Sequence, residues 1–94
     1  MIGIDFVNSV GYVPLTKTDA SGNAQVAVVD LTVGAKNPVL STLSITGAQR
    51  SIAMAYDLIH QTMLDEIETL DRQNTGVAII DTTTKKYTGT TIIG

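Results

Sequence analysis

His60 is the only histidine in the chain and the side chain best suited to acid–base chemistry near neutral pH. On a helix, Asp57 would lie three residues earlier on the same side and could orient the imidazole as a general base. The sequence supplies no cysteine nucleophile, no serine in a nucleophile elbow and no second histidine for a metal site. We therefore expect His60 to be a boundary residue beside an apolar stripe, and we expect the chain not to be an enzyme.

A second group of candidates is acidic and consists of Asp65, Glu66, Glu68 and Asp71. Neighbouring carboxylates can bind a divalent cation or divide the acid and base roles of a hydrolase. On a helix, however, Asp65 and Glu68 share a face while Glu66 points elsewhere, as on an ordinary solvated surface. We expect neither a metal nor a cofactor here.

Two loops carry weaker signals. The oxygen-rich segment Asp19–Asn23 lacks the later acidic ligands of a calcium loop, and its residue types favour a turn. Gly47 stands before an expected helix with Arg50 nearby, an arrangement that can bind an anion. A single glycine without a glycine-rich loop does not make a phosphate site.

Composition limits the classes of partner. Charged residues make up only 16% of the 94 residues, below the ~25% of typical domains, and threonine and serine fill the uncharged surface. Such a surface suits contact with neighbouring chains, although threonine is also used for its strand propensity. With a net charge of −3, we expect no nucleic acid and no membrane as partner, because both select basic patches. No apolar stretch is long enough to span a bilayer, and the first residues lack a secretory signal, so we expect synthesis in the cytoplasm.

Alternation of apolar and polar residues predicts three strands in the first half, at about residues 2–7, 24–33 and 39–45. A possible continuation of the first strand at Gly11–Leu15 contains Pro14, which belongs at an edge or bend. The short break at Gly34–Pro38 predicts that the second and third strands form an antiparallel hairpin.

A long amphipathic helix is expected from Gly47 to about Gln73. Thr46 and Gln49 have the spacing of a capping box, and Gly76 suits the closing position after the helix. Apolar residues recur at helical spacing in one stripe, namely Ile52, Tyr56, Ile59, Met63, Ile67 and Leu70. A hairpin at about 77–93 follows. The sequence therefore predicts a single α+β domain over residues 1–94, with a mainly antiparallel sheet, small sandwich or barrel packed against one helix.

From about Leu43 onward, the order of expected elements resembles small tail, tail-completion and baseplate proteins of tailed bacteriophages. The resemblance is carried by Leu43-Ser44-Ile45-Thr46-Gly47 leading into a long helix, the strand Gly76–Asp81, a polar turn, and Tyr87-Thr88-Gly89-Thr90-Thr91-Ile92-Ile93. It implies a subunit of a ring or tube in a virion tail. Its partners would be copies of itself and neighbouring structural proteins.

The expected mechanism is assembly through sheet edges. Local patterning leaves Val26, Val28, Ile92 and Ile93 without an obvious internal partner, so these four are the candidate assembly contacts. Two alternatives stay open. One is a head decoration or connector protein, and the other is a small cytoplasmic binding or regulatory module.

Overall fold

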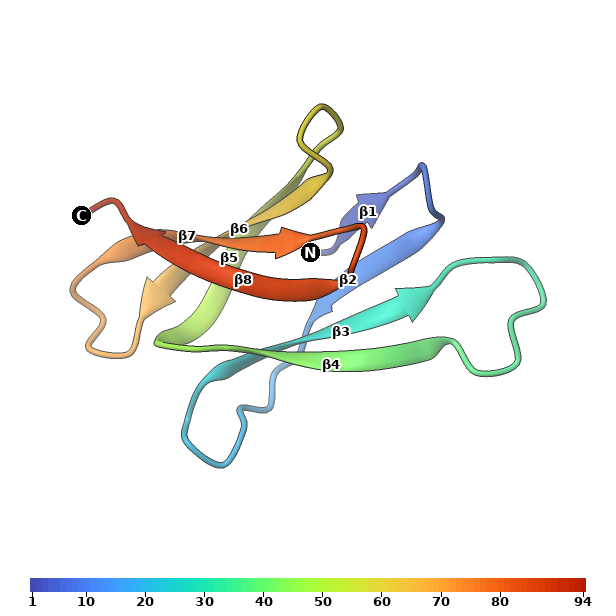
Figure 1. Ribbon diagram of the computed structural model, residues 1–94. Helices are drawn as coiled ribbons and strands as arrows, with labels where there is room; N and C mark the ends of the chain where they lie inside the picture. Colours follow the sequence, from blue (N-terminus) through green and yellow to red (C-terminus); the bar gives the residue numbers. More distant parts are fainter.

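The computed structural model describes all 94 residues and contains eight β-strands and no helix (Figure 1). The strands are β1 (Gly3–Asp5), β2 (Val10–Pro14), β3 (Ala24–Asp30), β4 (Val39–Ile45), β5 (Ala48–Asp57), β6 (Thr62–Thr69), β7 (Thr75–Asp81) and β8 (Lys86–Ile92). No element is a helix able to cross a membrane.

The strands form two antiparallel sheets, each a simple meander. Sheet A has the order β1-β2-β3-β4, and sheet B has the order β5-β6-β7-β8. The chain passes between them at Thr46–Gly47, where Gly47 has a φ of 82°, a conformation that favours glycine. The Gly47 amide donates to Asn23 Oδ1 (3.0 Å), and the Gly47 carbonyl accepts from the Leu70 amide (3.1 Å). Loops of both sheets therefore hold this corner in place.

The two sheets pack face to face as a sandwich. β1 and β3 contact β5, and β4 contacts β8. The thinnest extent of the molecule is 20 Å, as expected for two layers ~10 Å apart with their outer side chains. The core lies between the layers and contains Val10, Tyr12, Ala24, Val26, Val28 and Ile45 from sheet A, and Ala48, Met63, Ile67, Ala78 and Ile80 from sheet B.

The predicted α+β fold is wrong, because the segment expected to be a helix forms β5, a turn and β6. In β6, the buried Met63, Asp65 and Ile67 alternate with less buried neighbours, which is the two-residue period of a strand. β6 is also paired on both sides, by β5 and by β7. These two ladders satisfy its backbone groups in place of the bonds that a helix would supply.

The turn between β5 and β6 begins at Asp57. Its carboxylate accepts from the amides of Ile59 (3.1 Å) and His60 (3.2 Å), and Gln61 takes a φ of 52°. Side-chain bonds of this kind compete with helix formation, and a positive φ interrupts a helix. The predicted capping box is likewise absent, because Gln49 Oε1 accepts from Arg72 Nε (3.0 Å) instead.

The other predicted strands are found, and all but β4 have changed bounds. β4 spans residues 39–45 as the alternation places it, and it pairs with β3 as an antiparallel hairpin. β3 ends early at Asp30, whose carboxylate accepts from the Thr32 amide (2.9 Å). β1 is short for the same reason, since Asp5 accepts from the amides of Val7 and Asn8. The last hairpin is β7 with β8.

Candidate functional site

His60 and Asp57 meet, but at the exposed tip of the β5–β6 hairpin. His60 Nδ1 lies 2.7 Å from Asp57 Oδ2, and the His60 side chain is 76% exposed. The hydrogen bond with His60 is the main cause that lowers the pKa of the Asp57 carboxyl. Because neither residue lines the one groove of the molecule, the pair serves to close the turn.

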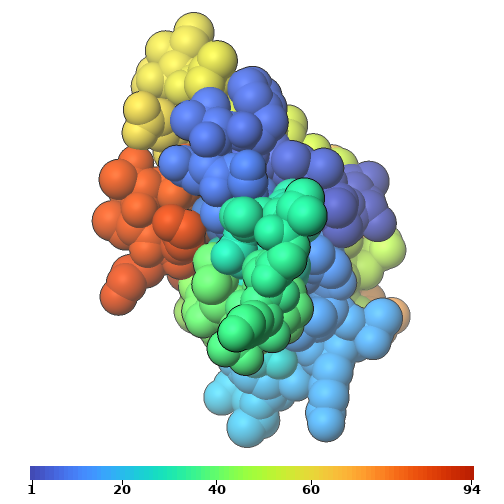
Figure 2. Space-filling model, turned by 90° about the vertical axis from the view of Figure 1, so that its right-hand side faces the viewer, coloured from blue at the N-terminus to red at the C-terminus, as the bar shows by residue number.

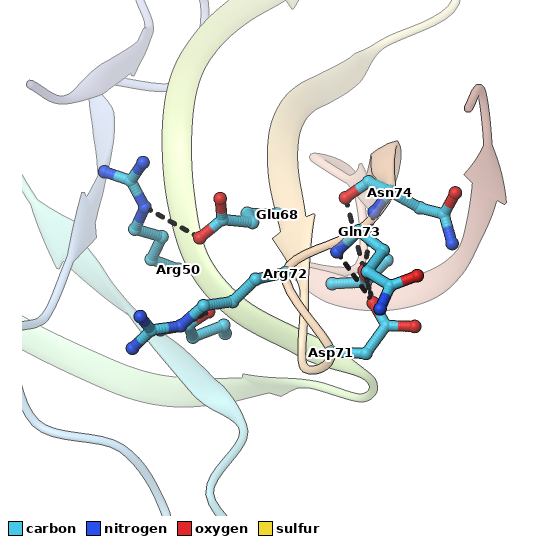
Figure 3. A network of polar contacts seen from close by, with 8 residues as sticks. Arg50, Glu68, Asp71, Arg72, Gln73 and Asn74 are labelled. Carbon is cyan, nitrogen blue, oxygen red and sulfur yellow. Dashed lines mark hydrogen bonds and ion pairs between the residues drawn. The ribbon is translucent and has the colours of Figure 1, made fainter.

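The acidic residues of the second candidate group are dispersed. Asp65 is buried, Glu66 is exposed, and Glu68 pairs with Arg50 (Oε1 to Nε, 3.2 Å) on the outer face of sheet B. Figure 3 shows this pair and the β6–β7 turn, where the Asp71 carboxylate accepts from the Thr69 hydroxyl and the Gln73 amide. No three potential metal ligands are brought together anywhere in the chain.

The loop candidates also have structural partners. Asp19 Oδ1 accepts from the amides of Ser21 and Asn23, both at 2.9 Å, as in a turn. The Gly47 amide, considered for an anion, is bonded to Asn23 Oδ1. Neither loop presents an open ligand set.

Two polar side chains lie buried in the core without full hydrogen bonding. Asp65 Oδ2 accepts from the Ser51 hydroxyl (2.8 Å), while its Oδ1 has no partner, and burial raises the pKa of this carboxyl to about 6. The Tyr12 hydroxyl also has no partner; burial, followed by the charges of Asp5 and Asp81, raises its pKa to about 12. Both are fully buried, so neither can meet a dissolved ligand while the core is intact.

The concave region of the surface is a groove between β4 and the turn that joins β7 to β8. We call it the β4 groove; it is open, with a volume of about 600 Å³. Its lining residues are Leu40, Ser41, Thr42, Leu43, Ser44, Thr84, Lys85, Lys86 and Tyr87. In the space-filling view, the orange-red β7–β8 turn borders the green residues of the β3–β4 region (Figure 2). The turn and the strand were both expected from the sequence, but only the packing of sheet B on sheet A brings them together.

One wall of the β4 groove is a free strand edge. The peptide groups of Gln25 and Leu31 point toward β2. The Gln25 carbonyl accepts from the Leu15 amide, and the Leu31 amide donates to the Ser9 carbonyl. In an antiparallel sheet, the peptide groups of successive residues point to opposite sides, so those of Val26 and Val28 point toward β4. Their partners on β4, Leu43 and Ser41, bond back toward β3. The peptide groups of Thr42 and Ser44 therefore point away from the sheet, toward the groove side.

The other wall carries the adjacent lysines Lys85 and Lys86. Asp81 starts the turn by accepting from the amides of Thr83 (2.8 Å) and Thr84 (3.3 Å), and Lys85 has a φ of 60°. Lys86 then pairs with Asp81 in the first position of the β7–β8 ladder. This hydrogen-bonded turn places both lysines at the groove.

The four predicted assembly contacts divide into two pairs. Val26 and Val28 are fully buried between the sheets, so the premise that they lack internal partners does not hold. Ile92 and Ile93 are 54% and 68% exposed at the end of β8, the outermost strand of sheet B. Only this second pair is available to a neighbouring chain.

The outer face of sheet A is another surface that sequence reasoning missed. Strand alternation and register place on it Ile4, Gly11, Val13, Gln25, Ala27, Val29, Val39 and Thr42, none of them charged. Leu31 lies over Gly11, where an added Cβ would be 3.4 Å from the Leu31 methyl carbons. Its signal in the sequence is the row Ala27, Val29 and Leu31, three apolar residues at every second position of the predicted strand.

Comparison with protein families, with curated proteins and with solved structures finds no match for this chain.

Proposed function

We propose that this chain is a non-enzymatic structural subunit of an oligomeric assembly, and that it associates with copies of itself and with neighbouring structural proteins through its sheet edges. The observation that carries the proposal is the open state of β4 and β8, the last strands of their sheets. An unpaired edge presents a row of amide and carbonyl groups that another strand can bond. Neither edge is covered by a helix, because the fold has none.

The distribution of apolar side chains supports the proposal. Only 18 of 94 residues are buried, whereas 16 large apolar side chains are exposed. Exposed apolar side chains are normal when scattered, but contiguous patches mark interaction sites. On the uncharged outer face of sheet A, Ile4, Leu31 and Val39 are exposed, and association would cover them.

The assembly we propose is a bacteriophage virion tail or baseplate. The chain would be one of its components, made in the host cytoplasm. The long helix in the resemblance is replaced by β5 and β6 in this chain. What still supports this identity is the low charge of the chain, the free edges and the final hairpin.

Changing Ile92 to Asp tests association through the β8 edge. Ile92 is half exposed, so the variant should stay folded, while a carboxylate at a strand edge opposes pairing. We expect light scattering to show large species for the natural chain at high concentration and monomers for I92D. Negative-stain imaging of the large species should show rings or tubes.

Leu58→Asp is the matched control, because Leu58 is 52% exposed at the β5–β6 turn, away from the β8 edge. This variant should assemble like the natural chain. A natural chain that stays monomeric at all concentrations, alone and with neighbouring structural proteins, would contradict the proposal. An unfolded I92D variant would place Ile92 in the internal core, in which case Ile93→Asp repeats the test.

A further inference from the structure

The β4 groove is a basic site on an acidic chain. Two of its nine lining residues are lysines and none is acidic, although the chain has a net charge of −3. Asp19 lies beside Ser44 at the edge of the lining, where its carboxylate is already bonded to its own loop. The groove therefore attracts negative charge at Lys85 and Lys86.

The groove also has the form that an extended chain requires. Its β4 wall, Leu40–Ser44, spans roughly 15 Å at about 3.3 Å per residue. The peptide groups of Thr42 and Ser44 point outward from β4 and can bond a further strand. Leu40, Leu43 and Tyr87 add apolar surface along the same path.

The geometry points to an acidic, extended peptide segment of another protein as the ligand of the β4 groove. The segment adds as a strand to the free edge of β4 and places alternate Asp or Glu side chains near Lys85 and Lys86. A second copy of this chain does not supply it. Its other edge strands are β1, β5 and β8, and they carry little free negative charge. Asp5 of β1 is buried, Asp57 at the end of β5 is bonded to His60, and β8 has no acidic residue.

This inference deepens the proposed function, since β4 is one of the two edges named there. It does not require self-association through β8. The two can fail separately, because peptide binding is measured at concentrations where the natural chain is monomeric, and self-association is measured without peptide.

Binding can be measured by fluorescence anisotropy with a labelled peptide of about eight residues that alternates Glu and Val. A peptide with Lys in place of Glu controls for charge. A Glu–Val peptide N-methylated at alternate amides controls for strand addition, because the methyl groups remove its donors to β4. We expect saturable binding of the first peptide only.

The double change Lys85→Glu and Lys86→Glu should weaken binding of the Glu–Val peptide by roughly tenfold or more, since attraction becomes repulsion. Lys17→Glu with Lys36→Glu is the matched control: both lysines are exposed, neither lines the groove, and the net charge changes equally. This control should leave the affinity within about twofold.

Thr42→Pro tests the backbone part of the site. Proline removes the outward amide of Thr42 but no bond of the β3–β4 ladder, as edge strands tolerate. We expect it to weaken the peptide roughly tenfold, while Thr42→Val, which keeps the amide, binds normally. If Thr42→Pro fails to fold, the N-methylated peptide answers the same question.

Three results would overturn the inference. The first is absence of binding to the Glu–Val peptide, and the second is equal loss in both double-lysine variants. The third is equally tight binding of the Glu–Val peptide and of either the N-methylated peptide or an anionic polysaccharide such as heparin. That result would mean that charge alone attracts ligands.

Discussion

Aspartate side chains set most of the turns in this protein. Six of the seven accept a hydrogen bond from an amide two residues later, namely Asp5, Asp19, Asp30, Asp57, Asp71 and Asp81. Each therefore marks a place where a strand ends or a loop folds back. Asp65 is the exception. It lies fully buried in the middle of β6, with one carboxylate oxygen unpartnered.

Asp65 should make stability depend on pH. Its pKa is raised from 3.8 to about 6, so between these values the unfolded chain binds fewer protons than the folded one. The contribution of Asp65 to stability is therefore greatest below the unfolded value and falls as pH rises through about 6, by about 3 kcal/mol. Urea unfolding at several pH values measures this change.

Asp65→Asn removes the titrating charge and keeps an acceptor for Ser51. We expect its stability to lack the decrease that the natural chain shows from about pH 4 to 6, and to exceed that of the natural chain at pH 7. Asp71→Asn, in an exposed turn, serves as a control that retains the decrease. Parallel curves for the natural chain and Asp65→Asn would show that folding does not change the pKa of Asp65.

At the scale of elements, β5 and β6 illustrate a competition between two periods. The apolar residues at helical spacing also include Met63 and Ile67, which lie on the inner face of β6 together with Asp65. A helix would have placed Asp65 on a solvated face, whereas the strand buries it. Pairing of β6 with β5 on one side and with β7 on the other decides for the strand.

The corner at Gly47 joins the two sheets and can be tested by substitution. Gly47 has a φ of 82°, and an added Cβ would meet nothing within 4 Å, so the cost of Gly47→Ala is backbone strain alone. We expect a loss of about 1–2 kcal/mol in the free energy of unfolding. Gly47→Asn should lose less, because asparagine tolerates this conformation. Equal losses would contradict strain as the cause.

At the scale of the whole molecule, a thin sandwich has two outer faces of different character. Sheet B presents Glu66 and the Arg50–Glu68 pair to solvent, while sheet A presents an uncharged face. The interface core of protein complexes is depleted of charge in the same way. We therefore propose the outer face of sheet A as a second contact surface beside the free edges.

Ile4→Lys combined with Leu31→Lys tests this surface. The two side chains are 47% and 42% exposed, so we expect the free energy of unfolding to change by no more than about 0.5 kcal/mol. Self-association measured by sedimentation velocity should decrease, because each partner would have to bury lysine charge. Ile52 on sheet B is 37% exposed, and Ile52→Lys should leave self-association unchanged. Equal effects of both changes would point to a general effect of net charge.

The sequence by itself determined what local chemistry controls. Alternation placed β4, and the residue types of Asp19–Asn23 indicated a turn that Asp19 indeed closes. The tertiary structure decided between helix and strand at residues 47–73, because β6 is paired by β5 on one side and β7 on the other and buries every second residue against sheet A. It also decided which face of β3 is internal: Val26 and Val28 lie against sheet B, and Ala27 and Val29 face outward. Both faces of that strand are apolar, so local pattern could not choose between them, and the β4 groove exists only because the two sheets meet there.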